Sequence, residues 1–254
     1  MRLKKITIFP VGITKSCVIA SRFLSDSGFL ITDHISPEIT HLLLDIPSFD
    51  ESNRLKDGSD LQDLLNRLPE SVTVIGGNLT HASLSQYQTI DLLADQVYLA
   101  KNAAITAECA LQVAADYSDT TFADTQVLIL GWGRIGKCLT KLLNAIDSKV
   151  TVAARKESDR AMAQALGCTS LDFSEVPKHL SQYGVLFNTV PYQTIDCSIL
   201  NQHEDCIKLD LSSAPGLVCD DIIVARGLPG KYAPKTSGKL IADTIQKALK
   251  EVTL

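Results

Sequence analysis

The sequence lacks any apolar run of the length that a membrane span needs, although 45% of its 254 residues are hydrophobic. It also lacks a basic excess, because the formal net charge is −5 and no basic stripe alternates with aromatic residues. These absences argue against a membrane protein and against nucleic-acid binding. The apolar content suffices for one large or two modest cores. No small-residue cleavage site follows the basic start at residues 1–5, so we expect a cytoplasmic protein.

Cysteine and histidine are present without the spacing of a metal site. Seven cysteines occur singly, with no C-x-x-C pair, and the five histidines fit no ligand pattern, so the sequence predicts no metal. The odd number of cysteines argues against a disulfide framework, and we expect most of them to be small core residues in a reducing compartment. A helix start can lower a thiol pKa, but Cys138 lies deep enough in its expected helix that packing is the simpler interpretation.

A glycine-rich turn is the most informative feature that the chain does have. Residues 127–130 are typical of a buried strand, the next six carry the pattern G-x-G-x-x-G, and residues 137–143 are typical of a helix. The first glycine permits the tight turn, the second lets the backbone approach a pyrophosphate, and the third lets the helix pack closely. This order favours a dinucleotide site over a purely structural turn. The candidate residues are Gly131, Trp132, Gly133, Arg134, Ile135 and Gly136.

The next strand, residues 149–154, indicates which dinucleotide binds. NAD enzymes usually carry an acid at the end of this strand for the ribose 2′-hydroxyl. This chain has Ala154, Arg155 and Lys156 there instead. An arginine can hold a 2′-phosphate through two charge-assisted hydrogen bonds. We therefore predict NADP(H) rather than NAD(H); the alternative is that both cations are solvated residues of a loop.

Strand-like and helix-like segments alternate along the whole chain, which predicts an α/β fold with two Rossmann-like lobes and parallel sheets. We expect a flavodoxin- or Rossmann-like substrate lobe over 1–100, a linker helix over 101–118, an NADP-binding Rossmann domain over 119–236, and a C-terminal helix over 237–254 that packs back. The first lobe has a lone Gly12 at its first turn, so we expect no second dinucleotide site there. Its expected strands are at 6–9, 29–31, 41–44, 72–77 and 97–99.

The segment 227–239, GLPGKYAPKTSGK, resembles the A subunit of dipicolinate synthase, as do the glycine loop and the segments 152–155, 188–191 and 209–213. The resemblance extends from about residue 100 to the C-terminus. It implies an NADP-dependent oxidoreductase, of a family found in spore-forming bacteria, that oxidises a dihydrodipicolinate-type cyclic dicarboxylate. It also implies a partner, which is a flavoprotein-like B subunit.

Two departures from that family favour a different function. The glycine-rich start of the family's first domain is absent, and only residues 217–221 separate Gly216 from the next expected strand. A parallel crossover normally needs a dozen or more residues, usually a helix. We therefore expect either that the last strand pairs differently or that the sheet edge is remodelled. The alternative function is a non-catalytic NADP-binding partner subunit or sensor.

Polar residues at the ends of the later strands are candidates for the remaining contacts. Those expected to bind the cofactor are Asn188, Thr189, Val190, Pro191, Asp210 and Ser212. For Asn188 and Thr189 the alternative is a strand-end turn, and for Asp210 it is anchoring of the backbone. The family match and the chemistry of a dicarboxylate suggest substrate contacts from Asn102, Thr106, Gly230, Lys231 and Thr236.

Glu108 and Lys235 are the candidate catalytic residues. Glu108 is the best carboxylate for proton removal, and Lys235 offers a cation near the start of the last helix. A helix cap or ion pair is the alternative for Glu108, and a solvated helix end for Lys235. We expect the linker helix and residues 230–236 to form opposite walls of a substrate cleft.

Overall fold

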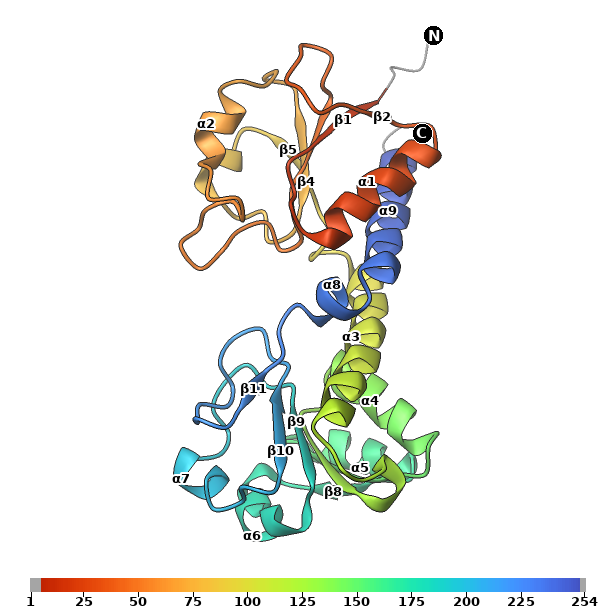
Figure 1. Ribbon diagram of the computed structural model, residues 1–254, viewed down its shortest axis with the longest axis vertical. Helices are drawn as coiled ribbons and strands as arrows, with labels where there is room; N and C mark the ends of the chain where they lie inside the picture. The colour runs from red at the N-terminus through yellow and green to blue at the C-terminus, as the bar shows by residue number, and fades with distance from the viewer. Residues whose placement is uncertain (1–5, 252–254) are drawn as a thin grey trace. The chain divides into compact units, whose positions relative to one another are not determined.

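The computed structural model describes residues 6–251, so the basic start at residues 1–5 lies outside the description. The chain divides into two compact units: Met1–Asn102 with Pro229–Leu254 (unit 1), and Ala103–Leu228 (unit 2). Each unit contains one parallel sheet with helices on its faces (Figure 1). The predicted α/β fold with two parallel sheets is therefore confirmed.

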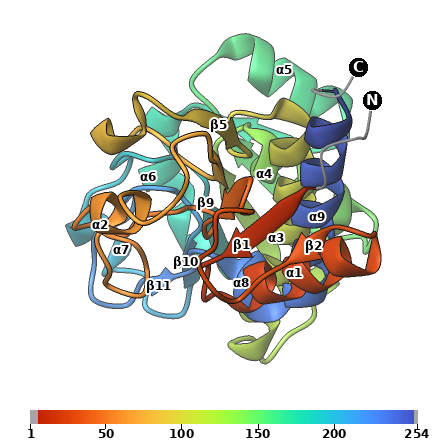
Figure 2. The ribbon, with the colours of Figure 1, turned by 90° about the horizontal axis from the view of Figure 1, so that it is seen from above.

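Unit 1 has a five-stranded sheet in the order β2-β1-β3-β4-β5, which is the flavodoxin-like arrangement. Its strands are β1 (Thr7–Pro10), β2 (Leu30–Ile31), β3 (His41–Leu43), β4 (Thr73–Gly76) and β5 (Gln88–Asp91). Its helices are α1 (Lys15–Asp26), α2 (Leu61–Leu65), α8 (Leu228–Tyr232), α9 (Pro234–Glu251) and the first part of α3 (Gln96–Asp116). Figures 1 and 2 show α1 and α9 together on one face of the sheet and α2 on the other.

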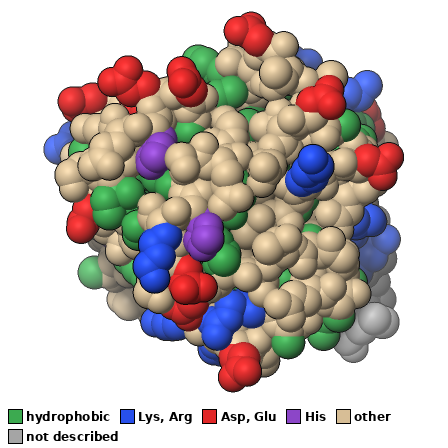
Figure 3. Space-filling model, turned by 90° about the horizontal axis from the view of Figure 1, so that it is seen from below, with side chains coloured by type: hydrophobic (Ala, Val, Ile, Leu, Met, Phe, Trp, Pro, Cys, Tyr) green, Lys and Arg blue, Asp and Glu red, His purple; other side chains and the backbone are tan. Residues whose placement is uncertain are grey.

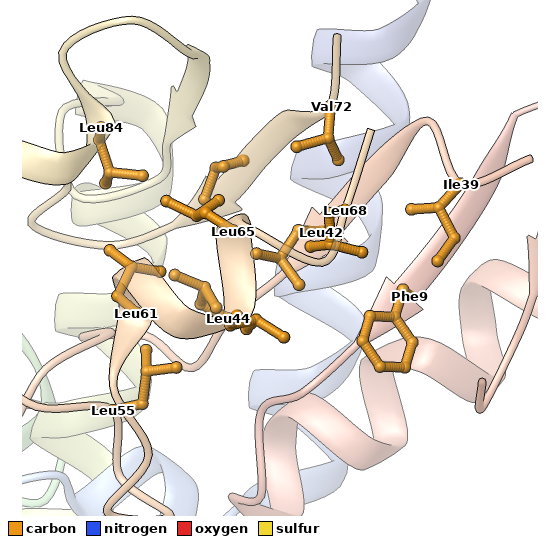
Figure 4. Packing of buried hydrophobic residues seen from close by; sticks show 12 residues of the cluster. Phe9, Ile39, Leu42, Leu44, Leu55, Leu61, Leu65, Leu68, Val72 and Leu84 are labelled. Carbon is orange, nitrogen blue, oxygen red and sulfur yellow. The ribbon is translucent and has the colours of Figure 1, made fainter. Parts of the chain in front are cut away.

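The core on the α2 side of this sheet follows from the alternation of side chains along the strands. Phe9, Leu42 and Val74, from three neighbouring strands, are buried in one cluster with Leu61 and Leu65 of α2. Figure 4 shows Leu42 packed beside Leu65 in this cluster. Leucine dominates this cluster because the helix and the loops around it contribute apolar residues at every inward position. The cluster holds α2 against the sheet.

The expected strand at residues 97–99 is wrong, because these residues form the first turn of α3. Asp95 explains the difference: its carboxylate accepts hydrogen bonds from the N–H groups of Val97 at 2.6 Å and Tyr98 at 3.0 Å. An aspartate in this position satisfies the free donors of a helix start and outweighs the strand preference of valine and tyrosine. The fifth strand of the sheet is β5, which lies several residues earlier.

Unit 2 has a six-stranded parallel sheet in the order β11-β10-β9-β6-β7-β8, which corresponds to the dinucleotide-binding arrangement. Its strands are β6 (Gln126–Leu130), β7 (Lys149–Ala153), β8 (Thr169–Leu171), β9 (Val185–Asn188), β10 (Ile207–Asp210) and β11 (Ile223–Val224). Its helices are the rest of α3, α4 (Arg134–Asn144), α5 (Glu157–Ala165), α6 (Val176–His179) and α7 (Cys197–Leu200).

The last strand pairs as in a regular parallel sheet, and only the short connection before it is remodelled. β11 pairs parallel with β10, with Leu209 opposite Ile223, although residues 211–222 contain no helix. The buried Lys208 side chain forms an ion pair with Asp221 in this loop. A loop held by side-chain contacts thus replaces the usual crossover helix.

A disulfide also holds this connection. Cys197 of α7 and Cys219 are paired, with their Cα atoms 5.4 Å apart. The expectation that the odd number of cysteines would leave no structural disulfide is therefore wrong for this pair. The other five cysteines are free, and four of them, all but Cys138, are buried. Burial raises the pKa of the Cys138 thiol, which agrees with a packing role.

Among residues 6–251, no helix is both long and apolar enough to cross a bilayer. On the face seen in Figure 3, acidic and basic side chains are interspersed and the hydrophobic ones form small, separate groups. This face therefore presents no single-sign field of the kind that attracts nucleic acid.

Candidate cofactor site

The turn between β6 and α4 has the geometry that its glycines predict. Gly131 adopts a φ of +102°, and a Cβ there would lie 2.5 Å from Thr189 Oγ1. A Cβ on Gly136 would lie 2.4 Å from the carbonyl oxygen of Gly131, so this glycine allows the close approach of helix and strand. Gly133 is the N-cap of α4 and has open space where its side chain would be. A pyrophosphate at this open backbone would meet the positive end of the α4 dipole.

A pocket of about 280 Å³ lies beside this turn. It is lined by Gly131, Trp132, Gly133, Ala154, Arg155, Lys156, Asp159, Phe173, Thr189, Val190, Pro191 and Tyr192. Nine of these twelve residues are among the sequence-predicted cofactor contacts. The pocket is at the carboxyl ends of β6, β7 and β9, where open α/β sheets bind ligands. These residues can therefore cradle a dinucleotide.

Three lining residues were not predicted from the sequence: Asp159, Phe173 and Tyr192. Asp159 lies in the first turn of α5, beyond the strand end at which an acid was sought. Its carboxylate shares the pocket with the exposed side chains of Arg155 and Lys156. The pocket therefore holds both a cationic pair, suited to a 2′-phosphate, and one carboxylate, suited to a ribose hydroxyl. The helical spacing of Asp159 from Lys156 was the signal that could have revealed it.

Asn188, Asp210 and Ser212, all predicted to bind the cofactor, lie outside the pocket lining and are buried. The Asn188 amide donates to Val190 O at 2.9 Å and to Asp210 Oδ1 at 2.8 Å, and its own oxygen accepts from the Val190 N–H. These side chains are engaged with the protein itself. In this structure they support the loop that carries Val190, and their direct contact with the cofactor stays a prediction.

Asp210 is the centre of this support. Its carboxylate accepts hydrogen bonds from the N–H groups of Ser212 at 3.1 Å, Gly216 at 3.0 Å and Leu217 at 3.3 Å. Burial raises the pKa of the Asp210 carboxyl, but hydrogen bonds from Ser212, Gly216 and Asn188 outweigh burial and lower the pKa from its ordinary value. The backbone-anchoring interpretation of Asp210 fits this geometry.

Two other predicted contacts belong to α4 rather than to the pocket surface. Arg134 begins the helix, and Ile135 follows it in the first turn. Neither lines the pocket, but both place their backbone at the helix start beside it, so their contact with a dinucleotide stays a prediction. Lys137 lies over the Trp132 ring, with Nζ 5.9 Å from the ring centre, and so covers one wall.

Unit 1 has a carboxylate at the place where a second dinucleotide loop would bind phosphate. Asp45 follows β3 and accepts hydrogen bonds at 3.0 Å from the N–H groups of Ile13 and Thr14, at the start of α1. A Cβ on Gly12 would lie 2.3 Å from Cys17 Sγ, so no open cradle exists at that glycine. These contacts support the expectation that unit 1 binds no second dinucleotide.

The predicted substrate residues of unit 1 lie on its C-terminal helices. Gly230 and Lys231 are in α8, and Lys235 and Thr236 are exposed in the first turn of α9. A Cβ on Gly230 would lie 3.3 Å from Ser16 Oγ, so this glycine lets α8 approach α1. The four residues therefore lie close to the start of α1 within the same unit.

The linker-helix residues do not share one face of α3. Asn102 and Thr106 are four residues apart and are neighbours on the helix surface, whereas Glu108 is two residues from Thr106 and points elsewhere. Thr106 is buried and Glu108 is exposed, as this geometry requires. A single ligand on one side of α3 cannot meet all three side chains. Among the described residues, no group of three acidic, histidine or cysteine side chains is arranged to hold a metal.

Comparison with known proteins connects this site to a family. Residues 94–204 match the family model described as D-isomer specific 2-hydroxyacid dehydrogenase, NAD binding domain. The A subunit of dipicolinate synthase from Bacillus subtilis is 27% identical over 206 residues, which are 75% of this chain and 69% of that protein. The crystal structure of the same subunit from Bacillus halodurans has a TM-score of 0.83 and 22% identity, covering 98% of this chain and 99% of that one. The crystal structure of the Bacillus subtilis subunit has a TM-score of 0.82 and 23% identity, covering 99% of this chain and 98% of that one.

Proposed function

From the confirmed similarity to the A subunit of dipicolinate synthase, we propose that this protein is an NADP-dependent oxidoreductase that oxidises a dihydrodipicolinate-type cyclic dicarboxylate. The match to an NAD-binding dehydrogenase domain already supports a nicotinamide cofactor. The observation that carries the proposal is the pocket beside Gly133, with Arg155 and Lys156 on its wall. When bound, the nicotinamide supplies the hydride acceptor, and the chain supplies binding and orientation.

Arg155 is the residue that we assign to the 2′-phosphate. Its side chain is exposed at the pocket and has no partner among residues 6–251, so its guanidinium is available to a ligand. Asp159 is the competing determinant, because it would repel a 2′-phosphate and could accept a hydrogen bond from a ribose hydroxyl instead. Calorimetric titration of NADPH and NADH decides between them. Tighter NADPH binding that Arg155→Ala removes would support the proposal, and tighter NADH binding would contradict it.

Unit 1 offers a basic corner for the substrate carboxylates. Gly238 of α9 packs against Ser16 near the start of α1, and Gln246 donates to Ser27 Oγ at 2.8 Å near the other end, so the two helices run in the same direction. The positive ends of both dipoles are therefore neighbours. Asp45 caps α1 and offsets part of this field. The cationic and hydroxyl side chains of this corner are Lys15, Lys231, Lys235 and Thr236.

A larger cavity in unit 1, of about 610 Å³, does not suit the same substrate. Its lining combines an apolar floor with His34, Arg67 and four carboxylates, those of Asp33, Asp57, Asp60 and Asp63, so acidic side chains outnumber the one arginine. Hydrogen bonds from His34 lower the pKa of Asp33, and those from Ser59 lower the pKa of Asp57, so both carboxyls are ionised at neutral pH. Such a rim repels a dicarboxylate. We therefore assign the substrate to the basic corner and not to this cavity.

The assignment of the proton acceptor remains a proposal about Glu108. Its carboxylate is exposed, but it lies on a different face of α3 from Asn102 and Thr106. A substrate that contacts Glu108 therefore does not contact the other two residues. Glu108→Gln preserves shape and removes the base. A large fall in kcat with unchanged NADPH affinity would assign the proton to Glu108, and full activity would exclude Glu108 as the proton acceptor.

The alternative function, a non-catalytic NADP-binding subunit or sensor, is favoured by one observation. Residues 211–222 replace a crossover helix with a loop at the sheet edge beside the site. Purified protein can be mixed with NADP and freshly made dihydrodipicolinate-type substrate, and absorbance followed at the wavelength of NADPH. Reduction of NADP supports the enzyme. Binding of NADPH without turnover, even after addition of a flavoprotein-like second subunit, supports the sensor.

We also propose that such a second subunit works beside this chain, because its relatives are named as one lettered subunit of a synthase. The cytoplasm is the proposed compartment. It is supported by the five free cysteines, whereas the Cys197–Cys219 pair is unusual for a reducing compartment. Thiol labelling of protein prepared without reductant measures the state of that pair directly.

A further inference from the structure

We propose that Arg160 is a positioning residue for cofactor selectivity: it fixes the turn that carries Arg155 without itself contacting the cofactor. The inference rests on the proposed preference for NADP(H). Arg160 lies in α5 and is absent from the pocket lining, so it stands behind the wall rather than in it. Its side chain is 24% exposed, much less than a free surface arginine.

One nitrogen of Arg160 connects three acceptors. Nη1 donates to the carbonyl oxygen of Ala154 at 2.8 Å, to that of Arg155 at 2.9 Å and to Asp172 Oδ2 at 2.8 Å. The first two acceptors are the backbone of the turn that leaves β7. The third is a carboxylate at the end of β8. A single guanidinium thus ties the ends of two neighbouring strands together.

These two strand ends are also two walls of the pocket. Ala154 and Arg155 line it from the β7 side, and Phe173, which directly follows Asp172, lines it from the β8 side. The Ala154 N–H also donates to Leu171 O at 3.1 Å, so the backbones already meet at this point. The Arg160 contacts set how these walls are oriented and how far apart they stand.

The contacts of Arg160 with the carbonyl groups of residues 154 and 155 and with Asp172 form a clamp. Asp172 is itself held in place, which makes this clamp rigid. Its Oδ1 accepts hydrogen bonds from the Ser174 N–H at 3.1 Å and from Ser174 Oγ at 2.9 Å, while Oδ2 receives Arg160. The hydrogen bonds from Ser174, with a contribution from Arg160, lower the pKa of the Asp172 carboxyl. The carboxylate therefore stays ionised at neutral pH.

Selectivity depends on this clamp because Arg155 has nothing else to orient it. The Arg155 side chain is exposed and has no partner among the described residues, so the backbone of the turn, which fixes where the side chain starts and in which direction it leaves, limits where its fork can reach. A bidentate contact to a phosphate requires that direction to be correct. NADH lacks the 2′-phosphate and does not use the fork. Loss of the clamp should therefore weaken NADPH binding much more than NADH binding.

The test is the ratio of NADPH to NADH dissociation constants in the purified full-length protein, measured by calorimetry. In Arg160→Ala we expect NADPH affinity to fall by about 10- to 100-fold, the range of a lost charge-assisted contact, with a much smaller change for NADH. Arg160→Lys keeps the charge and has three donors, but its side chain is shorter and lacks the planar guanidinium, so its ammonium cannot occupy the position of Nη1 and the variant should lose most of the same selectivity. Asp172→Asn has the same shape and can still accept the hydrogen bonds from Ser174, but it loses the charge that pairs with Arg160, so it should lose part of the selectivity for NADPH.

Lys178→Ala is the matched control, because it removes an exposed ion pair with Glu175 in the same unit. It should leave the ratio unchanged. If Arg160→Ala does not fold, as judged by circular dichroism, Arg160→Lys and Asp172→Asn carry the test. If the wild type prefers NADPH but the Arg160 and Asp172 variants keep its ratio of dissociation constants, the role of Arg160 is refuted while the NADP proposal stands. A wild type without that preference overturns the NADP proposal and the clamp with it.

Discussion

Replacement of Asp210 by asparagine tests whether a buried carboxylate holds the loop beside the cofactor pocket. Asparagine keeps the shape but turns one carboxylate oxygen into an N–H donor. In the place of Oδ2, that donor would face the N–H groups of Gly216 at 3.0 Å and Leu217 at 3.3 Å. A hydrogen bond to a charged acceptor is worth about 1.5–3 kcal/mol, so losing both should cost about 3–6 kcal/mol of unfolding free energy.

The assay can follow unit 2 selectively. Trp132 is the only tryptophan of the chain and lies in unit 2 beside the pocket, so its fluorescence during urea unfolding reports that unit. Asp220→Asn is the matched control, because Asp220 lies in the same loop and is exposed. It should change the unfolding free energy by less than about 0.5 kcal/mol. An Asp210→Asn protein as stable as this control at pH 7 would refute the reasoning.

The pH dependence gives a second check on Asp210. Its hydrogen bonds lower the pKa of the carboxyl in the folded protein despite burial, which opposes them. The stabilisation is therefore fully present above the unfolded value of about 3.9 and is lost as the pH falls through the lower folded value. The stability difference between wild type and Asp210→Asn should be constant from neutral to mildly acidic pH and shrink below about pH 4. A difference that grows in acid would contradict the assignment.

Three further substitutions test the two binding regions. Gly133→Val should abolish NADPH binding while circular dichroism and melting stay near wild type, since Gly133 has a φ of −79° and open space at its Cβ position; retained binding would refute the cradle. Asp159→Asn should tighten NADPH and weaken NADH by about two- to fivefold each in titrations, as expected for one half-buried surface charge, and a change of the opposite sign would refute its role. Lys235→Ala should weaken a cyclic dicarboxylate by about tenfold and NADPH by less than about twofold, and equal losses would mark Lys235 as structural.

The sequence predicts features whose causes are local. The strand, glycine turn and helix around Gly131 are encoded within a few consecutive residues, because the conformational demand of each glycine is met by its immediate neighbours. The same holds for Asp60, whose carboxylate accepts the Asp63 N–H and so starts α2 within three residues.

Features that depend on distant residues could not be predicted in this way. Asp210 looked like a strand-end ligand, yet its donors come from residues 188–217, and only the folded chain brings them together. The parallel pairing of β11 depends on Lys208 meeting Asp221 and on Cys197 meeting Cys219, contacts that no short-range pattern contains. Asp159 was missed for the opposite reason: it is close in sequence, but the turn of α5 redirects it into the pocket.

The Asp45 carboxylate at the start of α1 makes the two sheets differ in their capacity to bind an external anion. Both sheets place a helix N-terminus after a central strand, and both could attract an anion. In unit 2 that position is left open to a bound ligand, while in unit 1 the Asp45 carboxylate already accepts the hydrogen bonds of the Ile13 and Thr14 N–H groups. A chain built of two similar halves is thereby directed to bind its cofactor in only one of them. Replacing that carboxylate alone would uncover the N–H groups of Ile13 and Thr14, but the space for a phosphate beside Gly12 would still be filled by Cys17.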